Sequence, residues 1–191
     1  MVRTPRPLRL AAACIAALAL GATGCVAASA PPTKVDAYKN QLDRFPVVGA
    51  VSFKNDYGSS RGGGSRSHQG VDIMANRGQR VVAPESGTIT TAKWSSSCGY
   101  SLGISGDDGI YYLYCHLNNF ASGISKGSRV WAGKQVGKVG SSGNASYAYP
   151  HLHFEMHPGG AGRASMNPYY RLRNAADARV GLVSSPPKGW R

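Results

Sequence analysis

The stretch PHLHFEMH holds three of the five histidines in this 191-residue chain. A neutral imidazole is a common ligand of transition metals, and it also carries protons near neutral pH. If the stretch is a β-strand, alternation places His151, His153 and His157 on one face. Leu152 and Phe154 then point to the other face, into the core. The pattern predicts a strand held by apolar side chains that presents its imidazoles to a groove.

Two more histidines lie far upstream. His68 and Asp72 are four residues apart in SHQGVDIMA, and the intervening Gly70 and Val71 favour an extended or looped segment over a helix. His116 ends the run YLYCH, which is typical of a strand. Strict alternation would divide that run into two faces, one with Tyr112, Tyr114 and His116 and the other with Leu113, Cys115 and Leu117.

These residue types suit one kind of chemistry as a set. Two neutral imidazoles and one carboxylate form a frequent ligand set for catalytic zinc, which keeps a fourth position for water. Zinc polarises a carbonyl and lowers the pKa of water towards ~7. Histidines outside the ligand set can move protons and stabilise an oxyanion.

The elements that must position these residues are predicted to be short strands. The chain has 25 glycines, 11 prolines and 10 tyrosines. After the N-terminal 25 residues, no segment shows a long apolar period of 3.6 residues. Both observations favour an all-β class. Asp107–Gly109 is a hairpin turn signal. NPYYRLRNAA near the C-terminus could form a short helix. The predicted strands are residues 80–84, 87–94, 100–105, 109–117, 128–133, 135–140 and 151–157.

Four motifs in order carry a resemblance. HQGVDI, YCHL, GSSGNA and HLHFE begin at residues 68, 114, 140 and 151, with FPVVG before the first and HPGG after the last. Together they resemble the lysostaphin-type (LytM-like) zinc endopeptidases, which cut peptide bonds in bacterial peptidoglycan. The resemblance covers roughly residues 45–169. It implies a compact antiparallel β-sheet or sandwich of the duplicated hybrid motif, with a loop-walled groove over the metal.

The resemblance also implies a role for each residue of the site. His68, Asp72 and His153 are expected to bind one zinc ion per chain, and His116 and His151 are expected to be the catalytic pair that does not bind it.

Other residues near these motifs take lesser or alternative roles. Some family members have a tyrosine shortly before the first ligand that helps to bind the oxyanion. Here Tyr57 and Arg61 lie before His68 at a different spacing. Each could assist in oxyanion binding or be an ordinary loop residue. His157 is interpreted as a structural or surface residue. Glu155 shares its face and would form a salt bridge or a hydrogen bond to a ligand histidine.

The N-terminal 25 residues read as an export signal, with a basic start and an apolar run too short to span a membrane. ATGC ending at Cys25 resembles a bacterial lipobox, although Ala22 stands where leucine is usual. Cleavage near Ala28–Ala30 is the alternative. We therefore expect residues 1–25 as a signal, 26–44 as a tether, 45–170 as the peptidase domain and 171–191 as a tail. The expected location is the cell envelope, through a lipid anchor on the outer face of the membrane, with free secretion as the alternative.

Charge and cysteine content agree with export. The formal charge is +13; without the three leader arginines, 19 basic and 9 acidic side chains remain, which is +10. Such a surface attracts polyanions, of which anionic cell-wall polymers are the expected kind, or it serves only for solubility. No nucleic-acid-binding motif is present. Cys98 and Cys115 remain as an even pair, and a disulfide is the default for an exported protein.

Three alternatives compete with a peptidoglycan endopeptidase. The first is a non-hydrolytic member of the same family that regulates cell-wall amidases. The second is a biotinyl or lipoyl carrier, but the chain lacks the lysine-bearing hairpin. The third is a different zinc peptidase, but HExxH is absent and EMH at Glu155 is one residue short of ExxH. The expected partners are the stem and cross-bridge peptides of peptidoglycan. The sequence does not predict which of their peptide bonds is cut.

Overall fold

A computed structural model describes residues 42–182 of the chain. The expected export signal with Cys25, and the expected tether up to residue 41, lie outside these residues. Within 42–182, no helix is long and apolar enough to cross a membrane. The strands of the main sheet are β1 Val51–Ser52, β4 Val71–Ala75, β5 Arg80–Val82, β6 Gly87–Ser95, β7 Gly99–Gly106, β8 Ile110–Phe120, β9 Arg129–Val130, β10 Gln135–Val139 and β11 His151–Pro158.

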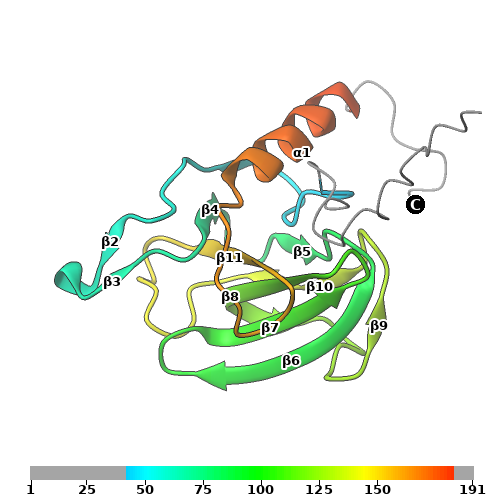
Figure 1. The fold of residues 1–191 in the computed structure, drawn as a ribbon, viewed down its shortest axis with the longest axis horizontal. Coiled ribbons are helices and arrows are strands. Elements are labelled where there is room, and N and C mark those ends of the chain that lie inside the picture. Colours follow the sequence, from blue (N-terminus) through cyan, green and yellow to red (C-terminus); the bar gives the residue numbers. More distant parts are fainter. Residues whose placement is uncertain (1–41, 183–191) are drawn as a thin grey trace, which may run out of the picture. The chain divides into compact units, whose positions relative to one another are not determined.

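The strands form one antiparallel sheet in the order β1-β4-β11-β8-β7-β6-β9, and β10 joins β5 and β8 (Figure 1). The predicted antiparallel β-fold is confirmed. All seven predicted strands are present, because runs rich in β-branched or aromatic residues are bounded by glycine or proline. Asp107 begins the turn between β7 and β8, as the hairpin signal predicted.

Alternation along β11 follows the prediction. Leu152, Phe154 and Met156 are fully buried in the core. The ring of Phe154 contacts those of Tyr112 and Tyr114 on the neighbouring strand β8, with centroids 6.0 and 5.4 Å apart. The apolar face therefore anchors β11 in the middle of the sheet and leaves its histidines on the opposite face.

Alternation along β8 does not follow the prediction. Tyr112, Tyr114 and Leu117 are all fully buried in the core, whereas His116 lies at the groove. The register against β7 moves three residues along β8, from Tyr114 to Leu117, while it moves only two along β7. His116 is the non-glycine residue with positive φ, at 64°, within the described chain. This irregularity turns His116 out of strict alternation, which explains why a period of two misplaced it.

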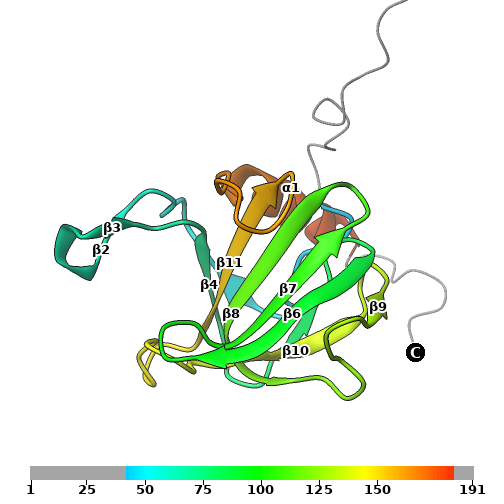
Figure 2. The ribbon, with the colours of Figure 1, turned by 60° about the horizontal axis from the view of Figure 1, so that its bottom comes forward.

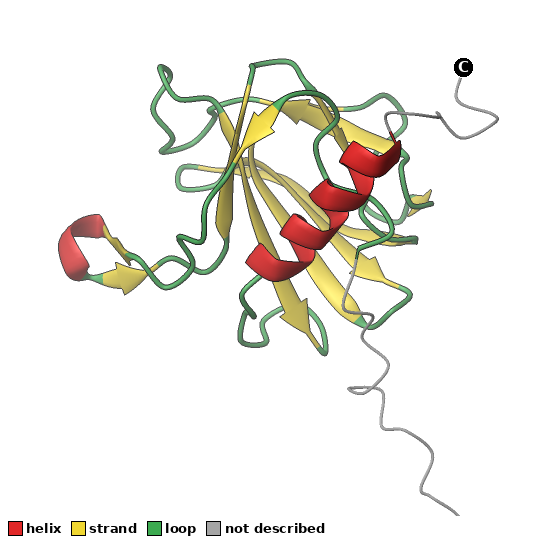
Figure 3. Cartoon of the chain, turned by 90° about the horizontal axis from the view of Figure 1, so that it is seen from above, coloured by secondary structure: helices red, strands yellow, loops and turns green. Residues whose placement is uncertain are grey.

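Residues beyond the expected 45–170 domain also pack into the core at both ends. The helix α1, Tyr169–Leu182, lies across one face of the sheet (Figure 3) and buries Leu172 and Ala175. Leu42, at the other end, is also buried in this core. The packed region therefore includes parts of the segments expected as tether and tail.

A small ribbon stands apart from the main sheet. Strands β2, Ser60–Arg61, and β3, Arg66–Ser67, pair with each other and are joined by the short 3-10 turn η1, Gly62–Gly64. Figure 2 shows this ribbon projecting from the segment that leads into β4. All three glycines of the turn have positive φ, which residues with a Cβ rarely adopt. The ribbon places Arg61 beside the start of β4.

Candidate metal centre

The register of β4 and β11 brings two of the predicted ligands together. Asp72 lies directly opposite His153 in the antiparallel pair, where Cβ atoms are ~5 Å apart. His68 approaches from the loop that precedes β4. Its Nε2 lies 2.9 Å from Nδ1 of His153 and 3.1 Å from Oδ1 of Asp72. Nδ1 of His153 is 3.0 Å from the same oxygen. Three possible ligand atoms therefore converge on one point.

The outer contacts of the two imidazoles decide which nitrogen faces this point. Nδ1 of His68 lies 3.0 Å from the backbone carbonyl of Asp56, and a carbonyl can only accept. Nε2 of His153 lies 2.7 Å from Oε1 of Glu155. Both outer nitrogens therefore carry the hydrogen, and in the neutral rings both inner nitrogens keep a free lone pair. Two lone pairs and a carboxylate oxygen that face one another fit a bound cation.

Arg61 supports the same cluster from the β2–β3 ribbon. Its Nη2 donates to Oδ2 of Asp72 and to Oδ2 of Asp56, at 3.0 Å each. It also lies 3.0 Å from Nδ1 of His68, but that nitrogen is committed to the carbonyl of Asp56. Burial by itself would raise the pKa of Asp72, yet its close contacts with the rings of His153 and His68 outweigh burial and hold the pKa well below its usual range. Asp72 therefore offers an ionised carboxylate, which accepts from Arg61 through Oδ2 and has Oδ1 available for a cation.

Two more imidazoles border the cluster, and backbone carbonyls orient both. Nδ1–H of His116 donates to the carbonyl of Ser142, and Nδ1–H of His151 donates to that of Tyr149, at 2.8 Å each. This leaves Nε2 of each ring as the free nitrogen. The two ring centroids are 4.9 Å apart, and Nε2 of His151 lies 3.9 Å from Oδ1 of Asp72. Burial, only partly offset by the Ser142 carbonyl, lowers the pKa of His116 to about 4, so this ring is neutral at neutral pH.

A groove of about 590 Å³ runs over the cluster. This volume is within the range of sites that enclose a ligand rather than a single water molecule. One part of its wall comes from Arg61 and Arg66 of the ribbon, and another from the loop at residues 144–146. The predicted groove is therefore present, with loops on two sides.

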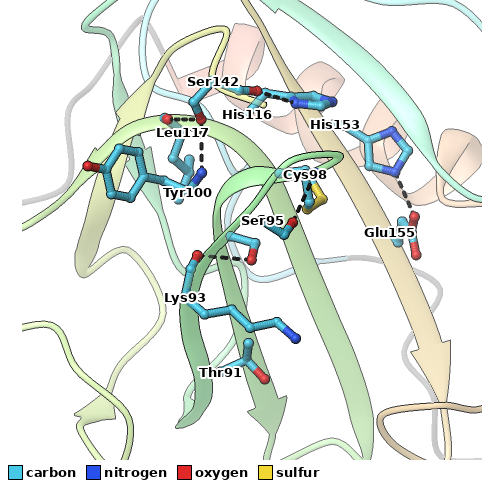
Figure 4. The surroundings of a disulfide bond; sticks show 12 residues. Thr91, Lys93, Ser95, Cys98, Tyr100, His116, Leu117, Ser142, His153 and Glu155 are labelled. Atoms are coloured by element: carbon cyan, nitrogen blue, oxygen red, sulfur yellow. Dashed lines mark hydrogen bonds and ion pairs between the residues drawn. A yellow bond between two sulfur atoms is a disulfide. The ribbon is translucent and has the colours of Figure 1, made fainter. Parts of the chain in front are cut away.

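Cys98 and Cys115 form a disulfide with Cα atoms 4.9 Å apart (Figure 4). Strict alternation predicted that Cys115 faces away from His116 and from the site. Instead, both cysteines line the groove together with His116, because the irregularity in β8 breaks the alternation between them. The disulfide fixes the β6–β7 turn to β8, and the carbonyl of Cys98 accepts the backbone N–H of His116 at 2.8 Å.

The two residues predicted to assist in oxyanion binding differ in their position relative to the groove. Arg61 lies in the groove, whereas the hydroxyl of Tyr57 donates to the carbonyl of Ser165 and is not part of the groove wall. The sequence does not predict the groups that orient the rings, which are the backbone carbonyls of Asp56, Ser142 and Tyr149. Since backbone carbonyls make these contacts, the residue types carried no signal, although GSSGNA did mark the loop of Ser142.

The chain is similar to known proteins over the same region. Residues 66–168 match the profile of peptidase family M23. The chain is 36% identical over 136 residues to an L-Ala–D-Glu endopeptidase of Bacillus subtilis, which is 68% of this chain and 42% of that protein. It is 30% identical over 113 residues to the murein hydrolase activator NlpD of Salmonella dublin, covering 59% of this chain and 27% of that protein. It therefore spans less than half the length of these relatives.

The fold is similar to that of a solved structure, the catalytic domain of the antimicrobial peptidase lysostaphin from Staphylococcus simulans. The TM-score is 0.57 at 31% sequence identity, over 64% of this chain and 92% of that domain. The region that matches the family profile, residues 66–168, includes the whole candidate metal centre of His68, Asp72 and His153.

Proposed function

Because the chain belongs to peptidase family M23, we propose that it is a zinc-dependent endopeptidase that hydrolyses peptide bonds in bacterial peptidoglycan cross-links. One observation carries this proposal: hydrogen bonds to Asp56 and Glu155 turn the bare nitrogens of two imidazoles toward an ionised carboxylate. An arrangement of this kind fits zinc, and the groove above it has room for a peptide.

His68, Asp72 and His153 would hold the zinc, through Nε2, Oδ1 and Nδ1. When bound there, zinc supplies a Lewis acid that polarises the scissile carbonyl and makes a water molecule more acidic. His116 and His151 would each present a free Nε2 to the reacting groups. A neutral imidazole in this position accepts a proton from the attacking water or, once protonated, hydrogen-bonds the developing oxyanion.

The test is cleavage of purified peptidoglycan by the zinc-loaded protein. We expect new amino termini to appear in the soluble fraction, to stop after zinc is removed with a chelator, and to return when zinc is added back. Digestion of peptidoglycans of defined cross-bridge, followed by mass spectrometry of the fragments, would identify the bond. Glycine bridges and stem-peptide bonds are both candidates.

A zinc-binding but non-hydrolytic regulator of cell-wall amidases is the second candidate, because one relative is named a murein hydrolase activator. The presence of His116 and His151 favours the peptidase, since a regulator would need neither Nε2. Stoichiometric zinc without release of any peptide, combined with stimulation of an added amidase, would favour the regulator instead.

The proposed substrate requires export to the cell envelope. The signal-like residues 1–25 support export, and Cys25 supports anchoring by lipid on the outer face of the membrane. The mass of the mature N-terminus would separate a lipid-modified Cys25 from free secretion. The net positive charge would add affinity for anionic wall polymers, which should weaken as ionic strength rises.

A further inference from the structure

His157 is tied to Glu155 rather than free at the end of its strand. Its Nε2 lies 2.7 Å from Oε2 of Glu155, and its Nδ1 lies 2.7 Å from the backbone carbonyl of Arg163. Each oxygen of Glu155 lies 2.7 Å from an imidazole nitrogen, Oε1 from His153 and Oε2 from His157, which is the contact pattern of a carboxylate that accepts twice. A carbonyl also only accepts. Both nitrogens of His157 therefore carry hydrogen, and the ring is an imidazolium.

The hydrogen bond to Glu155 raises the pKa of His157, which agrees with this geometry. The ring also packs edge-on against Tyr111, at a centroid distance of 5.9 Å. Only 13% of the side-chain surface of each of His157 and Glu155 is exposed, so water screens this ion pair less than it screens a surface pair.

Glu155 uses its two oxygens on two different imidazoles. Oε2 accepts from His157, and Oε1 accepts from Nε2–H of His153 at 2.7 Å. Figure 4 shows the second of these contacts, with the carboxylate on the far side of the His153 ring from His116. Gly70 packs against the same side chain, since a Cβ there would come within 2.9 Å of Cγ of Glu155. The carboxylate is thus held in one orientation from three sides.

We propose that His157 is a positioning residue of the metal centre: it fixes Glu155, which fixes His153 in the tautomer whose Nδ1 is free to bind zinc. This inference rests on the proposed zinc site. Without the imidazolium, the Glu155 carboxylate would be free to rotate toward solvent. His153 could then carry its hydrogen on Nδ1, the nitrogen that must bind the metal. Removal of the direct partner of a ligand histidine lowers metal affinity ~10- to 100-fold in other metal sites, and loss of His157, which holds this partner, should have an effect of up to the same size.

The experiment compares zinc affinity, measured by chelator competition, in the wild-type full chain and in three variants. His157→Leu removes both N–H groups and the charge, and we expect zinc binding that is weaker by up to ~100-fold. His157→Lys restores a cation beside Glu155 and should bind zinc within a few-fold of wild type. His157→Gln keeps one donor without the charge and should fall between them; it also serves if His157→Leu fails to fold.

A second measurement separates positioning from general stability. In the zinc-free protein, at a pH at which the His153 ring is neutral, ¹⁵N chemical shifts of this ring report which nitrogen carries hydrogen. We expect Nε2–H in wild type and in His157→Lys, and a shift of population toward Nδ1–H in His157→Leu. Wild-type zinc affinity together with unchanged His153 shifts in a folded His157→Leu would overturn the inference. If the wild type itself bound no zinc, the proposed function would fail first.

Discussion

At the scale of single residues, His151 and His153 lie on the same strand, and only the groups that they contact distinguish them. Both lie on the same face of β11. His153 lies opposite Asp72 and contacts His68, whereas His151 contacts the Tyr149 carbonyl and the ring of His116. The same type of side chain is therefore proposed to bind zinc at one position and to carry a proton at the other.

Alanine substitution should distinguish these two roles. His153→Ala removes a ligand nitrogen, so zinc content and activity should fall together. His151→Ala should keep most of the zinc and lose ~10²-fold or more in turnover, the range for a general acid–base group. Metal analysis and peptidoglycan hydrolysis of the same preparations check this. Retention of zinc in His153→Ala with its loss in His151→Ala would invert the assignment.

At the scale of elements, the loop at residues 140–145 docks against the β6–β7 turn and thereby orients His116. The Ser142 hydroxyl accepts the backbone N–H of Tyr100 and donates to the carbonyl of Leu117, at 2.9 and 2.6 Å (Figure 4). Its own carbonyl accepts from His116. The backbones approach so closely that a Cβ on Gly99 would lie 2.1 Å from the Ser142 hydroxyl.

Gly99→Ala should therefore disturb His116 without touching the metal. The added methyl group also meets a φ of +64°, and strain of this kind costs ~1–3 kcal/mol. We expect a lower melting temperature, lower turnover and unchanged zinc content. Gly123→Ala is the matched control, since it has positive φ but nothing within 4 Å of a Cβ. Equal turnover in the two variants would contradict the role given to this docking.

The disulfide also holds the β6–β7 turn in place. Cys98 and Cys115 close a loop with a sequence separation of 17, and the chain-entropy estimate for a loop of this size is ~3 kcal/mol. The double variant Cys98→Ser, Cys115→Ser should lose about this much unfolding free energy under oxidising conditions. It should also lose turnover, because the Cys98 carbonyl holds the backbone of His116. Denaturant unfolding and hydrolysis assays check both, and no change in either would refute the prediction.

At the scale of the whole molecule, the two ends of the described chain meet in one core. Leu42 and Phe45 belong to the same buried cluster as Leu172 of α1. The ring of Phe53 also contacts that of Tyr169, with centroids 5.9 Å apart. The helix is therefore part of the folded domain and supports the sheet from the face opposite the histidines of β11.

Leu172→Ala should destabilise the whole domain by ~2–5 kcal/mol, the usual cost of truncating a fully buried leucine. Tyr170→Ala, on the exposed side of the same helix, is the control and should cost far less, since 59% of Tyr170 is exposed. Denaturant unfolding of the two variants checks this. Similar values for both would mean that α1 contributes little to the core.

The sequence by itself determined what depends on neighbouring residues. The period of two in HLHFEM fixes which side chains enter the core, because alternation is a property of the extended backbone. Leu152 and Phe154 are buried as expected, and Met156 continues the same face. Runs of strand-forming residues bounded by glycine or proline predicted the strands. The ligand set came from four motifs in order, whose residue types are those that zinc requires.

Only the tertiary structure decided what depends on distant partners. The register of β4 against β11 sets Asp72 opposite His153, and the irregular register of β7 against β8 turns His116 into the groove. The tautomers depend on carbonyls far along the chain, which any residue type supplies. Alternation already puts His153, Glu155 and His157 on one face, but the carbonyl of Arg163, which orients the His157 ring, reaches it only in the folded chain.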